Sequence, residues 1–213
     1  MFIPKIYICT IDENISNVNN IIYSLKLNQE NVYINSPPKL HFKKNKIKSC
    51  TDNHLMCYRD AISNNYPFVL ILEDDVYEDY PICRVNNQIK KFIFDKQYEN
   101  WDILFLGCLP LSISKTKYTN IKQTNLAFCT HSYFISLKYM KEMVKWTADT
   151  ISQYVLGKSP LYLRDFNTCG GIDTFLALRD NNLYTLFPTV HYQSSIKTYP
   201  FIISLLEFFL EYT

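Results

Sequence analysis

The chain has 213 residues, of which 47% are hydrophobic and 20% charged, and it contains only four glycines. Average glycine usage would give roughly 15 in a chain of this length. The four are Gly107, Gly157, Gly170 and Gly171. Their spacing excludes both a Rossmann fingerprint and a Walker loop, which need clustered glycines. If the protein binds a nucleotide, the phosphates must be held in another way.

The formal net charge of +2 excludes the strongly basic footprint of a dedicated nucleic-acid binder. The length predicts a single domain over 1–200, followed by an apolar helix over 201–213. Seven cysteines, an odd number without a C-x-x-C pair, indicate a reducing compartment. No signal peptide pattern and no apolar run of about 18 residues is visible. We therefore expect a cytoplasmic protein without a transmembrane segment.

The first third of the chain alternates between predicted strands and a predicted helix. The apolar run 3–10 predicts a buried strand, 14–27 a helix packing on it and 32–35 a second strand. A lysine-rich loop over 39–48 follows, and it is either solvated or faces a phosphate or an acceptor. This order of elements is typical of an α/β fold.

The most informative segment follows a second predicted helix. Asp52 or Asn53 can cap that helix, which is expected to stop at 64–65. The continuous apolar run 68–72 then predicts a strand covered on both faces. It ends abruptly in three carboxylates at 73–75.

The later elements predict a mixed or mostly parallel sheet. In chain order they are strand 101–106, strand 126–136, helix 137–146, helix 173–181 and strand 183–187. The poorly patterned stretch 148–167 is expected to be a lid or an insertion. The terminal helix 201–213 either docks on the domain, pairs with a second copy or lies on a membrane surface.

Clustered carboxylates at a strand end cannot all stay ionised without a counter-charge. Hard oxygen ligands suit Mg²⁺ or Mn²⁺, and open α/β folds bind ligands at the carboxyl ends of their strands. In an extended backbone Glu73 and Asp75 point to one side and Asp74 to the other, so the first and third acids can share a site. The alternative is an acidic turn that caps the next segment.

Several segments together resemble the family 25 glycosyltransferases, the lipopolysaccharide and procollagen galactosyltransferase type. The similar segments are 49–54 (Ser-Cys-Thr-Asp-Asn-His), 67–75 (Pro-Phe-Val-Leu-Ile-Leu-Glu-Asp-Asp), 101–107 (Trp-Asp-Ile-Leu-Phe-Leu-Gly), 130–136 (Thr-His-Ser-Tyr-Phe-Ile-Ser), 172–173 (Ile-Asp) and 188–196. The resemblance implies a GT-A type α/β fold: one nucleotide-sugar-binding domain with a mixed, mostly parallel sheet flanked by helices.

The resemblance also implies the reaction. A galactose or glucose-type sugar passes from a UDP-sugar to a hydroxyl acceptor on a glycan or protein, with inversion and with Mn²⁺ or Mg²⁺ as cofactor. The direct metal ligand is assigned to Asp75. The full predicted metal set is Asp75, Glu73 and His191, and the predicted donor contacts are Glu73, Asp74, Ile8 and Thr10.

Inversion needs a base that takes the proton of the acceptor hydroxyl. The candidate is Asp173, which follows Gly170 and Gly171 and opens a predicted helix, as in other inverting GT-A enzymes. Its alternative role is that of a helix N-cap. His54 and His131 match family positions, and either supports the wall of the site or contacts substrate.

The chain departs from the family pattern in two places. Residues 9–14 hold no arginine where the family has one, and Ser49 and Asn53 replace the motif's glycine and serine. The missing arginine favours an alternative, a catalytically degenerate GT-A domain that binds nucleotide sugar or glycan without transfer. A third interpretation, a two-metal phosphoesterase, lacks the second His/Asp cluster that such a site needs.

Overall fold

The computed structural model describes residues 4–10, 14–36, 46–78, 84–96, 101–110, 112–125, 127–155, 182–187, 189 and 191–193. The helices of this part are α1 (Ile15–Ser24), the 3-10 turn η2 (Gln29–Asn31), α2 (Lys46–Ser63), α3 (Asn86–Lys96) and α4 (Leu137–Val155). Its strands are β1 (Lys5–Cys9), β2 (Val32–Asn35), β3 (Phe68–Glu73), β4 (Val76–Glu78), β5 (Ile103–Pro110), β6 (Ile121–Thr124), β7 (Ala127–Ser136), β8 (Leu183–Leu186) and β9 (His191–Gln193).

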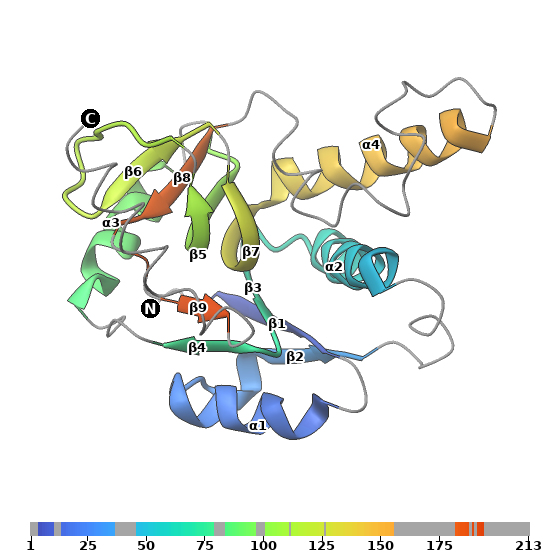
Figure 1. Cartoon of the computed structure of the whole chain (residues 1–213), viewed down its shortest axis with the longest axis horizontal. Helices are drawn as coiled ribbons and strands as arrows, with labels where there is room; N and C mark the ends of the chain where they lie inside the picture. The colour runs from blue at the N-terminus through green and yellow to red at the C-terminus, as the bar shows by residue number, and fades with distance from the viewer. Residues whose placement is uncertain are drawn as a thin grey trace.

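In the described residues a seven-stranded sheet has the order β2-β1-β3-β7-β5-β8-β6 (Figure 1). The pairs β1–β2, β1–β3 and β5–β8 are parallel, whereas β7 and β6 run antiparallel to their neighbours. Strands β2, β1, β3, β5 and β8 therefore share one direction, and the expected mixed, mostly parallel sheet is confirmed.

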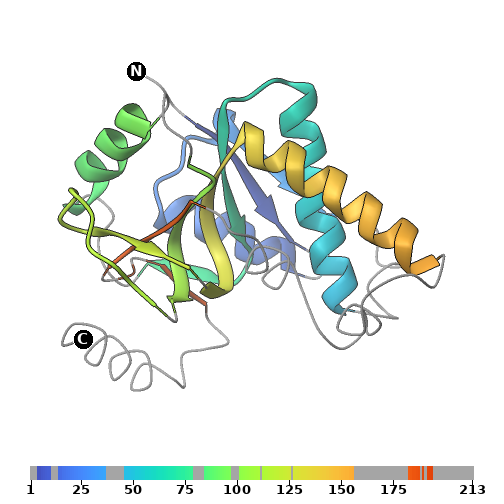
Figure 2. The same ribbon diagram turned by 90° about the horizontal axis from the view of Figure 1, so that it is seen from above.

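Helices cover both faces of this sheet. Figure 2 shows α2 and α4 on one side and α1 and α3 on the other. On β3, Val69 and Ile71 belong to the core under α2 and α4, whereas Leu70 and Leu72 belong to the core with α1 and α3. Because side chains alternate along a strand, both sets of β3 side chains are buried. This explains the continuous apolar run in the sequence.

A second, two-stranded sheet adjoins the carboxyl end of β3. Residues Asp74 and Asp75 form a turn that leads into β4, and β4 pairs antiparallel with β9. The register places Glu78 opposite His191. The sequence analysis did not predict β4, β9, β6 or α3.

The expected start of the second helix was wrong. Helix α2 begins at Lys46, inside the predicted lysine-rich loop, so Asp52 and Asn53 lie in its interior and do not cap it. Asn53 is instead engaged in tertiary contact, because its side-chain amide donates a hydrogen bond to the carbonyl of Thr10. Tertiary contact explains this buried polar residue better than local capping does.

The predicted end of α4 at 146 was also wrong, because the helix continues to Val155. The first part of the expected lid or insertion is therefore helical. No glycine or proline occurs between Leu137 and Gly157, so nothing in the sequence breaks the helix earlier.

Several predictions fall outside the described residues. These are the loop over 39–45, the helix 173–181 with Asp173, and the terminal helix 201–213 with its proposed pairing. The division into domains and the cytoplasmic location also stay predictions. Within the described part, no helix combines the length and apolarity that a membrane crossing requires.

Candidate functional site

The parallel pairing of β1 and β3 brings polar residues together at one edge of the sheet. Cys9 lies opposite Glu73, so the next residues, Thr10 and Asp74, follow side by side. The hydroxyl of Thr10 donates a hydrogen bond of 2.7 Å to Oδ2 of Asp74. Two of the predicted donor-binding residues are therefore in direct contact.

The backbone of Thr10 is fixed on both sides. Its N–H donates to the carbonyl of Asn35 at the end of β2 (3.0 Å), and its carbonyl accepts from Nδ2 of Asn53 on α2 (3.1 Å). Asn35 in turn donates to the backbone carbonyl of Asn53 (3.0 Å). This network ties β1, β2, α2 and the 74–75 turn together at a residue that is only 2% exposed. The hydroxyl of Thr10 is thus held in one position before any ligand binds.

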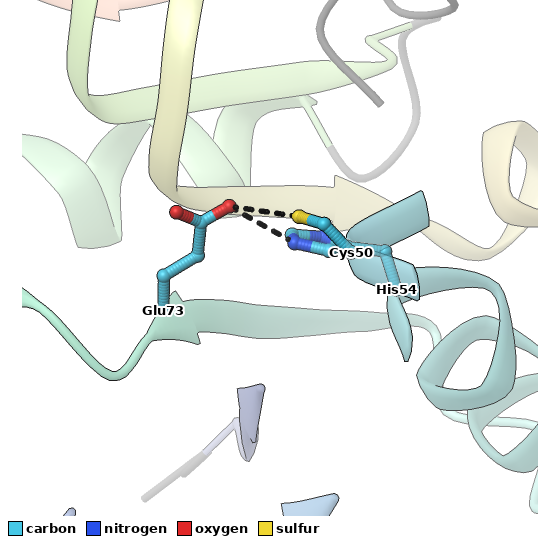
Figure 3. Close-up of side chains that lie close together, drawn as sticks. All are labelled: Cys50, His54 and Glu73. Carbon is cyan, nitrogen blue, oxygen red and sulfur yellow. Dashed lines mark hydrogen bonds and ion pairs between the residues drawn. The ribbon is translucent and has the colours of Figure 1, made fainter. Parts of the chain in front are cut away.

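Glu73 points to the opposite side, toward α2. Nε2 of His54 lies 3.2 Å from Oε1 of Glu73, and the thiol of Cys50 donates to the same oxygen at 3.6 Å (Figure 3). Cys50 and His54 are four residues apart on α2, the spacing that places two side chains on one helix face. One turn of helix therefore supplies both contacts to Glu73.

The far side of His54 is also fixed. Its Nδ1 shares a hydrogen bond of 2.6 Å with the hydroxyl of Tyr133, which is hydrogen-bonded in turn to the hydroxyl of Tyr58. Burial would raise the pKa of Glu73, but the hydrogen bond and electrostatic contribution of His54, with smaller contributions from His131 and Cys50, outweigh it and lower that pKa. Glu73 is therefore a carboxylate at neutral pH.

Asp75 differs in position from both of its acidic neighbours. Strand β3 ends at Glu73, and Asp75 lies in the turn that follows. The two-residue alternation expected for an extended backbone therefore does not continue to Asp75. Its side chain is half-buried and its Oδ1 is shielded from solvent.

His191 lies in a second buried cluster, with His131 and Ser132 of β7. Its Nδ1 is hydrogen-bonded to the hydroxyl of Ser132 (2.6 Å), and its carbonyl accepts from Nε2 of His131 (3.1 Å). Gly107 packs so closely that a Cβ there would clash with Nε2 of His131 and with the carbonyl oxygen of His191. Burial, aided by the charge of His131, lowers the pKa of His191 to about 3, so the ring is neutral. Its Nε2 is buried and makes no hydrogen bond within the described part of the chain.

The structure brings only some of the predicted site residues together. Glu73, Asp75 and His191 do not form one compact group of ligand atoms. The group present in the described residues consists of Cys50, His54 and Glu73, whose ligand atoms all lie within 4.8 Å of one another. The predicted metal set therefore stays a prediction.

Two other predicted residues take no visible part in this edge. The side chain of Ile8 is fully buried in the core with α1 and α3, so only its backbone is available to a ligand. Asp173 lies outside the described residues. Conversely, the sequence analysis assigned no chemical role to Cys50, because the predicted helix began only after Asp52 or Asn53, whereas α2 begins at Lys46 and carries both Cys50 and His54.

Comparison with known proteins shows the family of this chain. The sequence matches the family described as glycosyltransferase family 25 (LPS biosynthesis protein) over residues 21–156, well over half of the chain. The chain belongs to glycosyltransferase family 25. It is therefore a glycosyltransferase, as the sequence segments predicted. No curated protein matches the sequence of this family 25 member.

Solved structures support the fold of this family 25 protein. Mannose-1-phosphate geranyltransferase from Thermus thermophilus is similar with a TM-score of 0.53 at 9% identity, covering 85% of this chain and 73% of that one. This likeness, at such low identity, concerns the fold alone, and the predicted GT-A type α/β architecture is confirmed.

Two other solved structures have lower TM-scores. A197 from STIV has a TM-score of 0.42 at 10% identity and covers 86% of this chain and 82% of its own. A glycosyltransferase involved in the glycosylation of the major capsid of PBCV-1 has a TM-score of 0.40 at 15% identity, with 98% and 100% covered. Neither likeness bears on the reaction of the family 25 protein.

Proposed function

We propose that this protein is a metal-dependent inverting glycosyltransferase that moves a galactose or glucose-type sugar from a UDP-sugar to a hydroxyl on a glycan or protein. The observation that carries the proposal is the contact between Thr10 and Asp74, which fixes an acidic turn at the carboxyl ends of β1 and β3. Ligands of open α/β folds bind at such an edge. The family's sugar-transfer chemistry needs a donor site, and this edge suits one.

The residues at this edge fit a hard divalent cation. Asp75 has a carboxylate oxygen shielded from solvent, and carboxylate oxygens are the ligands that Mg²⁺ and Mn²⁺ prefer. We assign Asp75 as the direct ligand, with Asp74 beside it. Glu73 and the neutral ring of His191 complete the proposed set. When bound, Mn²⁺ or Mg²⁺ neutralises charge on the donor diphosphate as it leaves.

The remaining steps are assigned to the chain's own residues. Thr10 holds Asp74 in place, so the acidic turn needs no reordering when the donor binds. Asp173, at the start of a predicted helix after Gly170 and Gly171, takes the proton of the attacking acceptor hydroxyl. Such a base lets the oxygen attack opposite the leaving diphosphate, which inverts the anomeric carbon.

A second candidate is a domain that binds nucleotide sugar or glycan without transfer. The observation that favours it is the lack of an arginine after the first strand, where the family has one. The first arginine of this chain is Arg59. The acidic residues Asp75 and Asp173, both present, oppose it.

Titration of UDP into the purified protein, with and without Mn²⁺, tests the donor site. The proposal predicts binding that requires the metal and is lost on chelation. Asp75→Ala should abolish this binding. The matched control is Asp52→Ala, at a half-buried position in the middle of the α2 sequence, and this variant should keep the binding. Equal binding with and without metal would contradict the proposed role of the cation.

A further inference from the structure

We propose that Cys50, His54 and Glu73 form a separate site for a thiophilic transition metal ion, with Zn²⁺ as the class of ion that fits best. The inference rests on side-chain geometry alone and not on the proposed donor chemistry. It takes Glu73 out of the proposed donor-site set and assigns it to an ion on the α2 side of the sheet, where its carboxylate meets Cys50 and His54.

The spacing of the three ligand atoms fits tetrahedral zinc. With Zn–S of about 2.3 Å and Zn–N or Zn–O of about 2.0–2.1 Å, the edges of a tetrahedron are about 3.5 Å for sulfur to oxygen and about 3.4 Å for nitrogen to oxygen. The observed separations are 3.6 Å from Sγ of Cys50 and 3.2 Å from Nε2 of His54 to Oε1 of Glu73. Both edges that involve Oε1 therefore match tetrahedral zinc within a few tenths of an ångström, and Sγ of Cys50 and Nε2 of His54 lie within 4.8 Å of each other.

The identity of the ligands favours zinc over the ion of the donor site. Thiolate and imidazole select zinc and similar metals, whereas carboxylates without soft ligands suit Mg²⁺ and Mn²⁺. The three protein ligands leave the fourth position to a water or to an oxygen of a bound molecule. Cys50 is only half-buried, so solvent can reach this position.

The surroundings of His54 suit a metal ligand. Zinc on Nε2 requires the proton on Nδ1, which then donates to the hydroxyl of Tyr133 at 2.6 Å. The hydroxyls of Tyr133 and Tyr58 are hydrogen-bonded to each other, and either can donate. The pair can therefore reverse direction and serve both tautomers of His54. On zinc binding the thiol proton of Cys50 leaves to solvent, and no redox step is needed.

Cobalt titration of the full-length, chelator-treated protein in a thiol-free reductant tests this site. Without UDP, we expect one equivalent of Co²⁺ to give a thiolate-to-cobalt charge-transfer band that Zn²⁺ abolishes. Cys50→Ser should remove the band and weaken zinc binding by more than about 100-fold, because losing even an outer partner costs about 10- to 100-fold. Tyr133→Phe removes that outer partner and should weaken zinc binding by about 10- to 100-fold.

The matched control is Cys108→Ser. Cys108 is buried elsewhere and shares a hydrogen bond with Thr185 that a serine can keep, so the band should survive. Alkylation of the unsubstituted protein, read by mass spectrometry, should show Cys50 protected by Zn²⁺ and not by Mn²⁺. The proposal is overturned if the band persists in Cys50→Ser, or if Zn²⁺ neither binds nor protects Cys50. In the latter case Cys50 and His54 only hold Glu73 by hydrogen bonds.

Metal-dependent UDP binding is read out separately, so the two proposals can fail independently. If the unsubstituted protein shows the cobalt band but no Mn²⁺-dependent UDP binding, only the donor site is contradicted. If it shows Mn²⁺-dependent UDP binding but no cobalt band, only the zinc site is contradicted.

Discussion

The hydroxyl of Thr10 donates a 2.7 Å hydrogen bond to Asp74 and so joins the end of β1 to the turn after β3. The two strands are parallel neighbours, which places their carboxyl ends at one edge of the sheet. Because the acceptor is a carboxylate, this bond is of the stronger, charge-assisted kind. The bond therefore holds the acidic turn against the end of β1.

Replacing Thr10 with valine keeps the shape of the side chain and removes the hydroxyl. We expect Thr10→Val to lower the free energy of unfolding by about 1.5–3 kcal/mol, the range for a hydrogen bond to a charged group, and to weaken Mn²⁺-dependent UDP binding. Thr10→Ser keeps the hydroxyl and is the control. Urea unfolding and UDP titration measure the two effects, and unchanged UDP affinity in Thr10→Val would show that the bond does not position the donor site.

Asp173→Asn tests the proposed base. The variant should bind UDP and Mn²⁺ as the unsubstituted protein does, because the amide has the size of the carboxyl group. Transfer should fall by about 10²- to 10⁴-fold, the usual contribution of a general base. Steady-state kinetics with a working donor and acceptor measure this, and transfer at the original rate would remove Asp173 as the base.

Gly107→Ala should destabilise the fold. The added Cβ would meet the ring of His131 and the carbonyl of His191, two groups that are hydrogen-bonded to each other. Overpacking of this kind costs about 1–3 kcal/mol. Urea unfolding gives the value, with the slope checked for two-state behaviour. A variant as stable as the unsubstituted protein would mean that β5 and β9 can separate without cost.

His191 should make stability depend on pH. Burial and the charge of His131 lower its pKa from 6.5 to about 3 in the folded protein. Between these values the unfolded chain binds more protons than the folded one, so the free energy of unfolding rises with pH. One proton corresponds to at most about 1.4 kcal/mol per pH unit.

The test of this prediction is the difference between two unfolding series. His191→Gln should show a shallower rise across the same pH range, while Glu73 and the other acids contribute equally to both proteins. Equal slopes would mean that His191 is not held neutral by its surroundings.

The sequence was sufficient for most strands of the sheet, though not for β6, and for the location of the acidic turn. The runs at 3–10, 32–35, 68–72 and 126–136 predicted strands within a few residues of β1, β2, β3 and β7. Strands β1 and β3 are buried on both faces, which is why their segments are nearly unbroken apolar runs. The carboxylates at 73–75 then had to lie at the carboxyl edge of the sheet.

The geometry of the side chains was beyond the sequence. Asn53 has the character of a helix cap, yet in the folded chain its amide binds the carbonyl of Thr10 from within α2. The pairing of β4 with β9, which buries His191, joins two three-residue strands more than 110 residues apart. Such short strands carry no periodic signal. Contacts of this kind depend on the whole fold and not on local pattern.

Release of UDP from a panel of UDP-sugars, measured with Mn²⁺ and after its removal by chelation, is the decisive experiment for metal-dependent sugar transfer. We expect release from at least one donor, dependent on Mn²⁺ and lost in Asp75→Ala. Tight UDP binding without release from any donor would contradict transfer and favour the binding domain. Release that continues after the metal is removed would contradict the metal-dependent mechanism.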